Sequence, residues 1–265
     1  MSILYFFISF LASTIGAISG IGGGVIIKPV LDATGTLSVS TISFLSGCTV
    51  LSMAIVSLFR NRKSGATLDL KRTTFLGIGA AGGGLLGKYL FDFIKTAVGN
   101  ENIVGLIQAI VLIIMTIGVF FYVTFKDKIK AYDIYNKLFC LISGLALGLI
   151  SSFLGIGGGP INIAILYFFF SMAPKTAALN SIYIILLSQI TSLVFTLGTN
   201  NVPTFRTFVL ITMIIGGISG ALVGSKIVKK LTQKQVDFFF RILMLVIIAI
   251  NIYNIVKFWI AIEVM

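Results

Sequence analysis

The stretches Gly20-Ile21-Gly22-Gly23-Gly24 and Gly155-Ile156-Gly157-Gly158-Gly159 decide the fold of this chain. They begin 135 positions apart, share one pattern, and each lies within strongly apolar sequence. A helix interior does not easily carry four glycines in five positions, because glycine loses the most conformational freedom on folding. Non-helical backbone at membrane depth persists only where protein covers it or where it lines a polar cavity. The two stretches therefore predict paired helix breaks around a cavity, which is the best sequence pointer to a transporter's binding site.

The composition is that of an integral membrane protein. Of the 265 residues, 57% are hydrophobic and 11% are charged, and the mean hydropathy is +1.09. A soluble domain has about a quarter of its residues charged. The apolar runs are long enough for helices that cross a bilayer and lack the alternation of barrel strands. We therefore predict an all-α integral membrane protein in the lipid bilayer.

The formal charge of +12 invites comparison with nucleic-acid-binding proteins. The Lys and Arg residues, however, lie in short segments between apolar runs, where they orient helices, so we expect no nucleic-acid partner. The chain has no His, and Cys48 and Cys140 both lie within predicted helices. We expect no metal site, no disulfide and no cofactor. No positive charge precedes the first apolar run, which argues against a cleaved signal peptide.

Ten apolar segments form two sets of five. The first set is 3–20, 24–33, 38–60, 73–95 and 103–125, and the second set is 138–154, 160–171, 175–197, 205–226 and 236–260. The glycines at 79, 83 and 87 recur at 216, 220 and 224, so the duplication covers the whole half. We therefore predict two repeats, 1–125 and 138–265, joined by a cytoplasmic linker at 126–137.

Positive charge sets the predicted topology, because short cytoplasmic loops carry an excess of Lys and Arg. Three segments are basic, namely 60–72, 126–137 and 226–234, whereas the turn at 198–205 has no charged residue. This pattern places the three basic segments inside the cell and the uncharged turn outside. The segments 3–33 and 138–171 must then enter the membrane and return on the same side.

Each of these two segments is therefore predicted to be a re-entrant helical hairpin, since its second arm of about ten residues is too short to cross. Three transmembrane helices follow each hairpin, and this odd number inverts the second repeat relative to the first. Both termini are predicted to be extracytoplasmic in the cytoplasmic membrane. An alternative lets 3–20 and 138–154 cross fully, which gives parallel repeats but fits the charge pattern less well.

The predicted hairpin tips are candidates for an anion-binding site. A second arm begins directly after each set of glycines, so its unpaired N–H groups and the positive end of its dipole face one point. Such a helix end favours an anion. The candidate binding residues here are Gly22, Gly23, Gly24, Gly157, Gly158 and Gly159. The alternative that the glycines only permit turning and close packing stays open, although duplication favours a functional role.

Uncharged polar residues inside the membrane are the second group of candidates. We expect them to face the bundle interior, because unpaired polar groups are unfavourable in lipid. The candidates for contact with a solute are Ser46, Asn162, Asn180, Ser181 and Gln189. Serine can instead bond to its own helix, so the larger amides Asn180 and Gln189 are the stronger candidates.

Charged residues are expected to stay out of the membrane centre. Lys28 and Lys175 lie at the predicted hairpin exits, where a solvated flanking position is expected. A proton-coupled carrier normally uses a buried titratable group, and the sequence indicates none. Export by facilitated diffusion would need no coupling ion, and the sequence leaves uniport and coupled transport both open. The two glycine stripes predict close helix contacts, with a monomer favoured and a dimer possible.

The chain resembles the TauE/SafE sulfite exporter family of membrane permeases over nearly its full length. The resemblance rests on the stretch from Gly20 to Pro29, on Gly155 to Pro160, and on Ala177-Ala178-Leu179-Asn180-Ser181. That last stretch departs from the family pattern Ala-x-Gly-Thr-Ser at Leu179 and Asn180, and the corresponding stretch 42–46 keeps only Ser46. Membership implies export of sulfite, sulfoacetate or related organosulfur anions.

These observations favour a transporter of a small anionic solute over an enzyme. An anion channel of the same fold is one alternative. A permease or membrane enzyme that uses Cys48 as a nucleophile is another, although Cys48 has no nearby base in the sequence. A purely structural membrane protein gives no reason for two buried glycine breaks.

Overall fold

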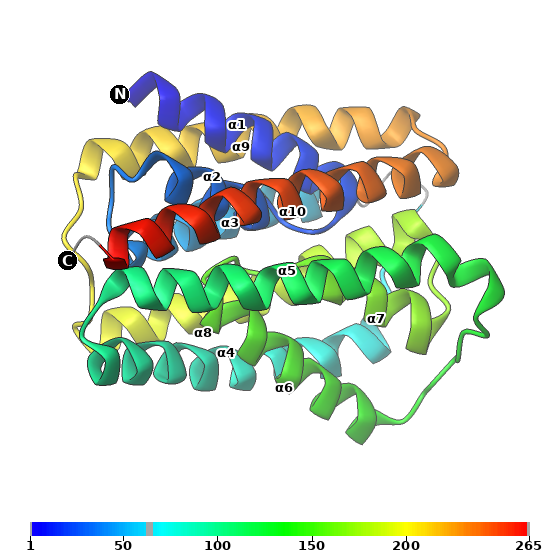
Figure 1. Cartoon of the computed structure of the whole chain (residues 1–265). Helices are drawn as coiled ribbons and strands as arrows, with labels where there is room; N and C mark the ends of the chain where they lie inside the picture. Colours follow the sequence, from blue (N-terminus) through cyan, green and yellow to red (C-terminus); the bar gives the residue numbers. More distant parts are fainter. Residues whose placement is uncertain (1, 62–65, 264–265) are drawn as a thin grey trace.

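The computed structural model describes residues 2–61 and 66–263, and in this part of the chain the regular structure is helical (Figure 1). The first half holds α1 (Ser2–Ser19), α2 (Gly24–Thr34), α3 (Val39–Asn61), α4 (Leu70–Val98) and α5 (Glu101–Phe125). A short 3₁₀ turn, η1 (Lys126–Lys128), leads into the linker. The second half holds α6 (Lys137–Phe153), α7 (Pro160–Phe170), α8 (Pro174–Gly198), α9 (Thr207–Lys230) and α10 (Gln233–Glu263). The prediction of an all-α protein is confirmed.

Two helices, α4 and α10, begin three residues earlier than the hydrophobic pattern predicted, because polar residues cap them. Asp69 accepts a hydrogen bond from the Arg72 backbone N–H at 3.1 Å, which starts α4 at Leu70. Thr232 and Gln235 form a reciprocal capping box ahead of α10, with N to O distances of 2.8 and 3.3 Å. Capping satisfies N–H groups that have no partner within the helix, so both helices extend beyond their apolar cores.

Five helices are long and apolar enough to cross a membrane. They are α3, α5 together with η1, α8, α9 and α10. The helices α1, α6 and α7 are apolar but shorter. The sixth predicted crossing, 73–95, corresponds to α4, which has 29 residues but is diluted by glycines and by Lys88, Asp92 and Lys95. The chain is a multi-pass membrane protein.

Corresponding helices of the two halves run in opposite directions along the long axis of the molecule. Figure 1 shows α1 and α3 running from left to right, while α6 and α8 run from right to left. The start of α1 and the end of α10 lie at the same end.

The described parts of the basic segments contact one another at the end of the molecule opposite to the chain ends. Arg72 pairs there with Asp133 of the linker, and Lys126 pairs with Asp237 of α10. The Lys175 backbone N–H also donates to Gln233 Oε1 at 2.7 Å. The described parts of the three basic segments therefore share one end, opposite to the chain ends.

The two glycine stripes pack against the first arms of the opposite hairpins. A Cβ atom added at Gly79, Gly83 or Gly87 of α4 would lie 2.0–2.2 Å from the carbonyl oxygens of Leu141, Leu145 and Leu149 of α6. A Cβ added at Gly216, Gly220 or Gly224 of α9 would lie 2.3–2.7 Å from those of Phe6, Phe10 and Thr14 of α1. Both stripes therefore serve helix contacts within one chain.

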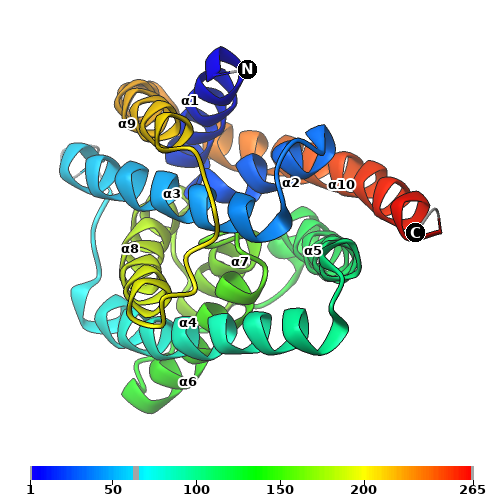
Figure 2. The ribbon, with the colours of Figure 1, turned by 90° about the vertical axis from the view of Figure 1, so that its left-hand side faces the viewer.

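These two tight pairs form the outer walls of the fold. Figure 2 shows α1 with α9 on one side and α4 with α6 on the opposite side, with α3, α7 and α8 between them. Each stripe thus holds the first arm of a hairpin from the other half, so neither hairpin is packed by its own repeat alone.

Candidate functional site

The two glycine segments meet inside the protein. A Cβ added at Gly24 would lie 2.0 Å from the carbonyl oxygen of Ile156, and one added at Gly158 would lie 3.2 Å from that of Ile21. The side chains of Ile21 and Ile156 are 0% and 2% exposed. The tips, defined here as residues 20–24 and 155–159, are therefore buried and in backbone contact.

The backbone of the tips requires glycine. Gly20 and Gly22 have φ angles of +76° and +88°, and Gly155 and Gly157 have angles of +66° and +70°. Residues other than glycine rarely adopt these φ angles. The tips differ at the fourth position, where Gly23 has a φ of −65° and Gly158 a φ of +147°. The sequence thus specified both turns locally.

The amide groups of the tips lack partners. Gly22, Gly23, Gly24, Gly157, Gly158 and Gly159 are all buried. Within residues 2–61 and 66–263, none of their N–H groups donates a hydrogen bond. Buried backbone N–H groups without a partner are rare and call for a ligand, a water molecule or an ion. The six unpaired amides are the principal chemical feature of this region.

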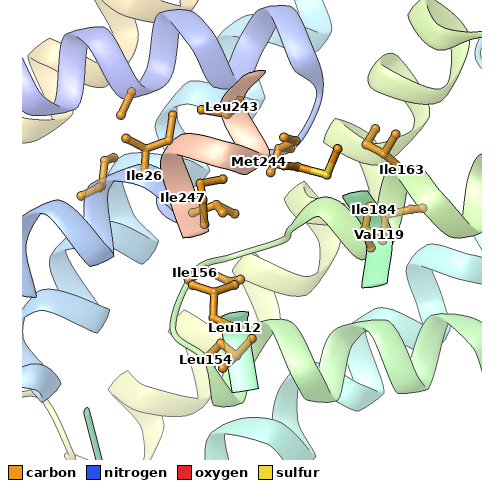
Figure 3. Close-up of a cluster of buried hydrophobic side chains, with 14 of the residues drawn as sticks. Ile26, Leu112, Val119, Leu154, Ile156, Ile163, Ile184, Leu243, Met244 and Ile247 are labelled. Atoms are coloured by element: carbon orange, nitrogen blue, oxygen red, sulfur yellow. The ribbon is translucent and has the colours of Figure 1, made fainter. Parts of the chain in front are cut away.

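Apolar side chains surround the tips and keep bulk water away. Figure 3 shows Ile156 and Leu154 of the second tip region beside Leu112 of α5, with Ile26 of α2 and Ile247 of α10 in the same cluster. In such surroundings electrostatic attraction between the amides and an anion is stronger than in water.

A small cavity of about 30 Å³ adjoins the second tip. Its lining is Ser43, Phe44, Gly47, Lys88, Phe91, Ser152, Gly155, Gln189, Ser192, Leu193 and Thr196. The hydroxyl oxygens of Ser43 and Ser152 are buried without a partner in the described chain. This volume holds only a water molecule or two. Entry of an oxyanion therefore requires the cavity to widen.

Gln189 is a predicted site residue whose side chain lies next to the second tip. Its side chain is 4% exposed, lines the cavity and makes no hydrogen bond with the described residues. Its amide carbon would lie 2.9 Å from a Cβ added at Gly157. An unpaired amide next to the tip can donate to the oxygens of a solute.

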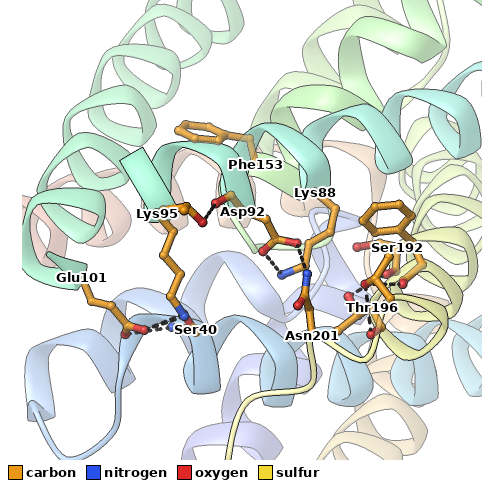
Figure 4. Close-up of polar contacts among 12 residues, drawn as sticks. Ser40, Lys88, Asp92, Lys95, Glu101, Phe153, Ser192, Thr196 and Asn201 are labelled. Atoms are coloured by element: carbon orange, nitrogen blue, oxygen red, sulfur yellow. Dashed lines mark hydrogen bonds and ion pairs between the residues drawn. The ribbon is translucent and has the colours of Figure 1, made fainter. Parts of the chain in front are cut away.

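Lys88 supplies a cation at the same cavity. Figure 4 shows its ammonium group beside Asp92, at 3.4 Å from Oδ1. The Asp92 carboxylate also accepts a hydrogen bond from Asn201 at 3.4 Å. Ser43, Ser152 and Lys88 were not among the predicted site residues, and only the placement of Lys88 on the glycine-bearing helix could have suggested it.

The other predicted polar residues fall into two groups. Ser46, Asn162 and Ser181 are 0–1% exposed and each has a side-chain oxygen without a partner in the described chain. Asn180, by contrast, accepts hydrogen bonds from Asp69 N and Thr73 Oγ1 and donates to the Thr67 and Thr176 carbonyls. Its amide fastens the start of α4 to α8 and has no free donor.

The expectation that Lys28 is a solvated flanking charge is wrong. Lys28 and Asp32 are 3% and 7% exposed and form an ion pair of 2.8 Å. Lys28 is therefore buried instead of solvated at a hairpin exit. Their burial is possible because Lys28 and Asp32 are four residues apart on one helix and neutralise each other.

The two cysteines lie on different helices. Cys48 is half-buried in α3 and Cys140 is buried in α6, and both are free thiols. No group of three or more His, Cys, Asp or Glu side chains that could hold a metal was found among the described residues.

Long apolar helices, paired buried glycine turns and unpaired amides together define a membrane protein with an internal polar site. The chain belongs to the sulfite exporter TauE/SafE family, whose model matches residues 5–252. It is 23% identical over 259 residues to the probable membrane transporter protein YunE of Bacillus subtilis (strain 168), covering 89% of this chain and 92% of that protein. No solved structure matches the chain. The chain is thus a member of a membrane transporter family.

Proposed function

We propose that this protein exports small organosulfur oxyanions, such as sulfite, sulfoacetate or related sulfonates, by alternating access. The observation that carries this proposal is the meeting of two buried tips whose six amides have no partner. Amides at helix N-termini favour anions because their dipoles and N–H groups point at the ligand. The family name supplies the sulfur chemistry.

The proposed site combines backbone and side-chain donors. The amides of Gly22–Gly24 and Gly157–Gly159 bind the anion, and the Gln189 amide and the Ser43 hydroxyl complete the shell. Ser46, Asn162 and Ser181 hold their unpaired oxygens in the buried regions behind the tips. We leave Asn180 out of this shell, because its hydrogen bonds are filled within the protein.

The proposed transport cycle follows from an inverted repeat. The opposite directions of α1 and α6 support one hairpin entering from each side of the membrane. The clustering of basic segments at one end supports a cytoplasmic position for that end and extracytoplasmic termini in the cytoplasmic membrane. Contact between the tips represents a closed state, and rocking of one hairpin against the other opens the site to alternate sides.

The membrane potential supports the outward direction of transport. Moving one charge across the membrane is worth about 2.3 kcal/mol per 100 mV. A negative cell interior therefore drives outward any solute that crosses with a net negative charge.

The test is a transport assay in reconstituted vesicles with Gly23→Ala. Gly23 has an ordinary φ of −65°, so alanine fits the backbone, and its Cβ would lie 3.1 Å from Ser13 Oγ beside the tip amides. We expect the rate to fall about tenfold or more, because the added methyl group crowds Ser13, displaces the Gly23 amide and so weakens its hydrogen bond to the anion.

Gly82→Ala is the matched control, because nothing lies within 4 Å of a Cβ added there. Sulfite, sulfoacetate, thiosulfate and sulfate form the substrate panel. Equal rates for the two variants, with both proteins inserted, would refute the tip site. A rate that never saturates would instead show a channel.

A further inference from the structure

The buried pair Lys28–Asp32 lies between two spaces of different character. Lys28 is on α2, one helical turn after the first tip, and its Cε would lie 3.4 Å from a Cβ added at Gly155. Ser43 is beside the same point, at 2.4 Å from that Cβ position. Since Gly155 and Ser43 both line the cavity at the second tip, the Lys28 side chain ends directly behind the cavity wall.

Asp32, the partner of Lys28, borders the second space. It lines an open pocket of about 340 Å³ together with Gly35, Glu101, Lys257 and other residues at the end of the molecule opposite the basic segments. Its Oδ2 holds Lys28, while Oδ1 is buried without a partner among the described residues. An unpaired carboxylate oxygen next to an open pocket is positioned to receive a proton.

The charge on Asp32 depends on what Lys28 binds. In the closed state Lys28 and Asp32 neutralise each other, so the interior carries no net charge from them. A buried charge without a partner is strongly unfavourable. When an anion occupies the tip site, it competes with Asp32 for the Lys28 ammonium group. The carboxylate that loses its partner is then stabilised by protonation.

We propose that Asp32 takes up one proton when an anion engages Lys28, so that anion and proton cross the membrane together. This inference rests on the proposed function, because it needs an anion at the tips. The proton comes from water in the pocket at Glu101 and Lys257 and converts the Asp32 carboxylate to a carboxylic acid. When the site opens to the other side, the anion leaves Lys28 and the carboxyl group releases its proton, which restores the ion pair.

The groups that face Asp32 from neighbouring helices are bonded elsewhere, so they do not neutralise its carboxylate in place of the proton. Lys257 of α10 donates to the backbone carbonyls of Asp32 and Ala33 at 2.8 and 3.0 Å rather than to the carboxylate. Glu101 of α5 is engaged by Lys95 of α4 and by Ser40 of α3. From α1, the Tyr5 hydroxyl is paired with Thr36. Lys28 is therefore the only cation bonded to the Asp32 carboxylate among the described residues.

The experiment measures accumulation of radiolabelled thiosulfate and sulfoacetate in vesicles that contain the full-length protein, with the membrane potential held at zero. Neither anion titrates near neutral pH. We expect accumulation on the more alkaline side of about tenfold per unit of pH difference, as one proton per anion requires. Saturable flux without accumulation would overturn the proposal and leave the tip site standing.

Variants test whether Asp32 is the residue that carries the proton. Asp32→Asn is expected to keep downhill flux and lose the proton-driven accumulation, whereas Glu101→Gln, in the same pocket, is expected to keep it. Accumulation that survives in Asp32→Asn would overturn the role of Asp32. If Asp32→Asn does not fold, the double variant Lys28→Gln with Asp32→Asn removes both charges, and any proton-driven accumulation that it retains would overturn the role of Asp32. Absence of saturable flux for both anions in the unmodified protein would overturn the proposed function as well.

Discussion

The surroundings of the two tips differ although their backbones are alike. The second tip faces the polar side chains of Ser43, Ser152 and Gln189. At the offset of 135, the equivalent positions around the first tip are Ala178, Ala17 and Ala54, all of which are buried. Duplication therefore repeated the scaffold, while the hydrogen-bonding groups gathered on one side of the contact between the tips.

The second arms of the hairpins show the same contrast. Both α2 and α7 have 11 residues. The first carries Lys28 and Asp32, whereas the equivalent positions of the second are Ile163 and Tyr167. Because the two tips are in contact, Lys28 of the first arm also lies beside the second tip. Each repeat thus contributes a different part of the proposed site.

The largest expected effect comes from breaking the charged pair. Lys28→Met leaves the Asp32 charge buried without its partner and should destabilise the protein by about 3–5 kcal/mol. Ile163→Met, at the equivalent position of α7, exchanges one apolar side chain for another and should shift stability by less than about 1.5 kcal/mol. Thermal unfolding of the purified proteins in detergent compares them. Equal losses would mean that the two arms tolerate change alike.

A smaller effect is expected at the glycine stripes. In the α4–α6 pair, Gly144 and Gly148 face the carbonyl oxygens of Leu76 and Ala80 at 2.0 Å from an added Cβ, so glycine is packed from both helices. The equivalent positions of α1 are Ser9 and Ser13, and that pair is less tight.

Gly83→Ala should therefore destabilise the protein by about 1–3 kcal/mol through overpacking. Gly220→Ala, at the equivalent position of α9, should destabilise it less, and Gly82→Ala serves as the unpacked control. The measurement is the midpoint of thermal unfolding. A greater loss for Gly220→Ala would reverse the order of tightness inferred from the backbone distances.

Gln189→Ala makes the second tip resemble the first, where Ala54 occupies the equivalent position. Removing an amide that has no partner should leave stability within about 1 kcal/mol. Loss of one hydrogen bond to a charged solute should raise KM about tenfold. Transport kinetics and thermal unfolding are measured on the same preparation. An unchanged KM would remove Gln189 from the proposed shell.

The smallest effect is expected for Cys48→Ala. Cys48 is a half-buried free thiol on α3, and its equivalent in the second half is Tyr183. Transport should stay within about twofold, because the thiol has no adjacent base to activate it. Loss of transport in a well-folded variant would instead support a cysteine relay.

Helices and turns could be predicted from the sequence because their causes are local. Apolar runs favour membrane helices wherever they occur, and the tip glycines adopt positive φ angles that other residues avoid. The resemblance to the TauE/SafE family likewise rests on motifs that can be read along the chain, and the family match confirms it. The inverted arrangement and the tip site stay predictions.

The roles of individual side chains could not be predicted in the same way, because they depend on which segments of the two halves come into contact. Asn180 looked like a ligand, yet its amide is used to hold the residues before α4, which are more than 100 positions away along the chain. Lys28 looked like a flanking cation, yet α2 carries it beside the second tip. The residues before α4 are far from Asn180 in sequence, and the second tip is far from Lys28, so no periodicity could reveal these contacts.

The amino-acid sequence by itself determined the membrane class, the ten principal helices and the two glycine turns, because each follows from hydropathy and local backbone preference. Only the tertiary structure decided which tip gained the polar cavity and where the buried charges lie. The physical reason is that a hydrogen bond or an ion pair depends on distance in space, and packing of the glycine stripes against the opposite hairpins sets those distances.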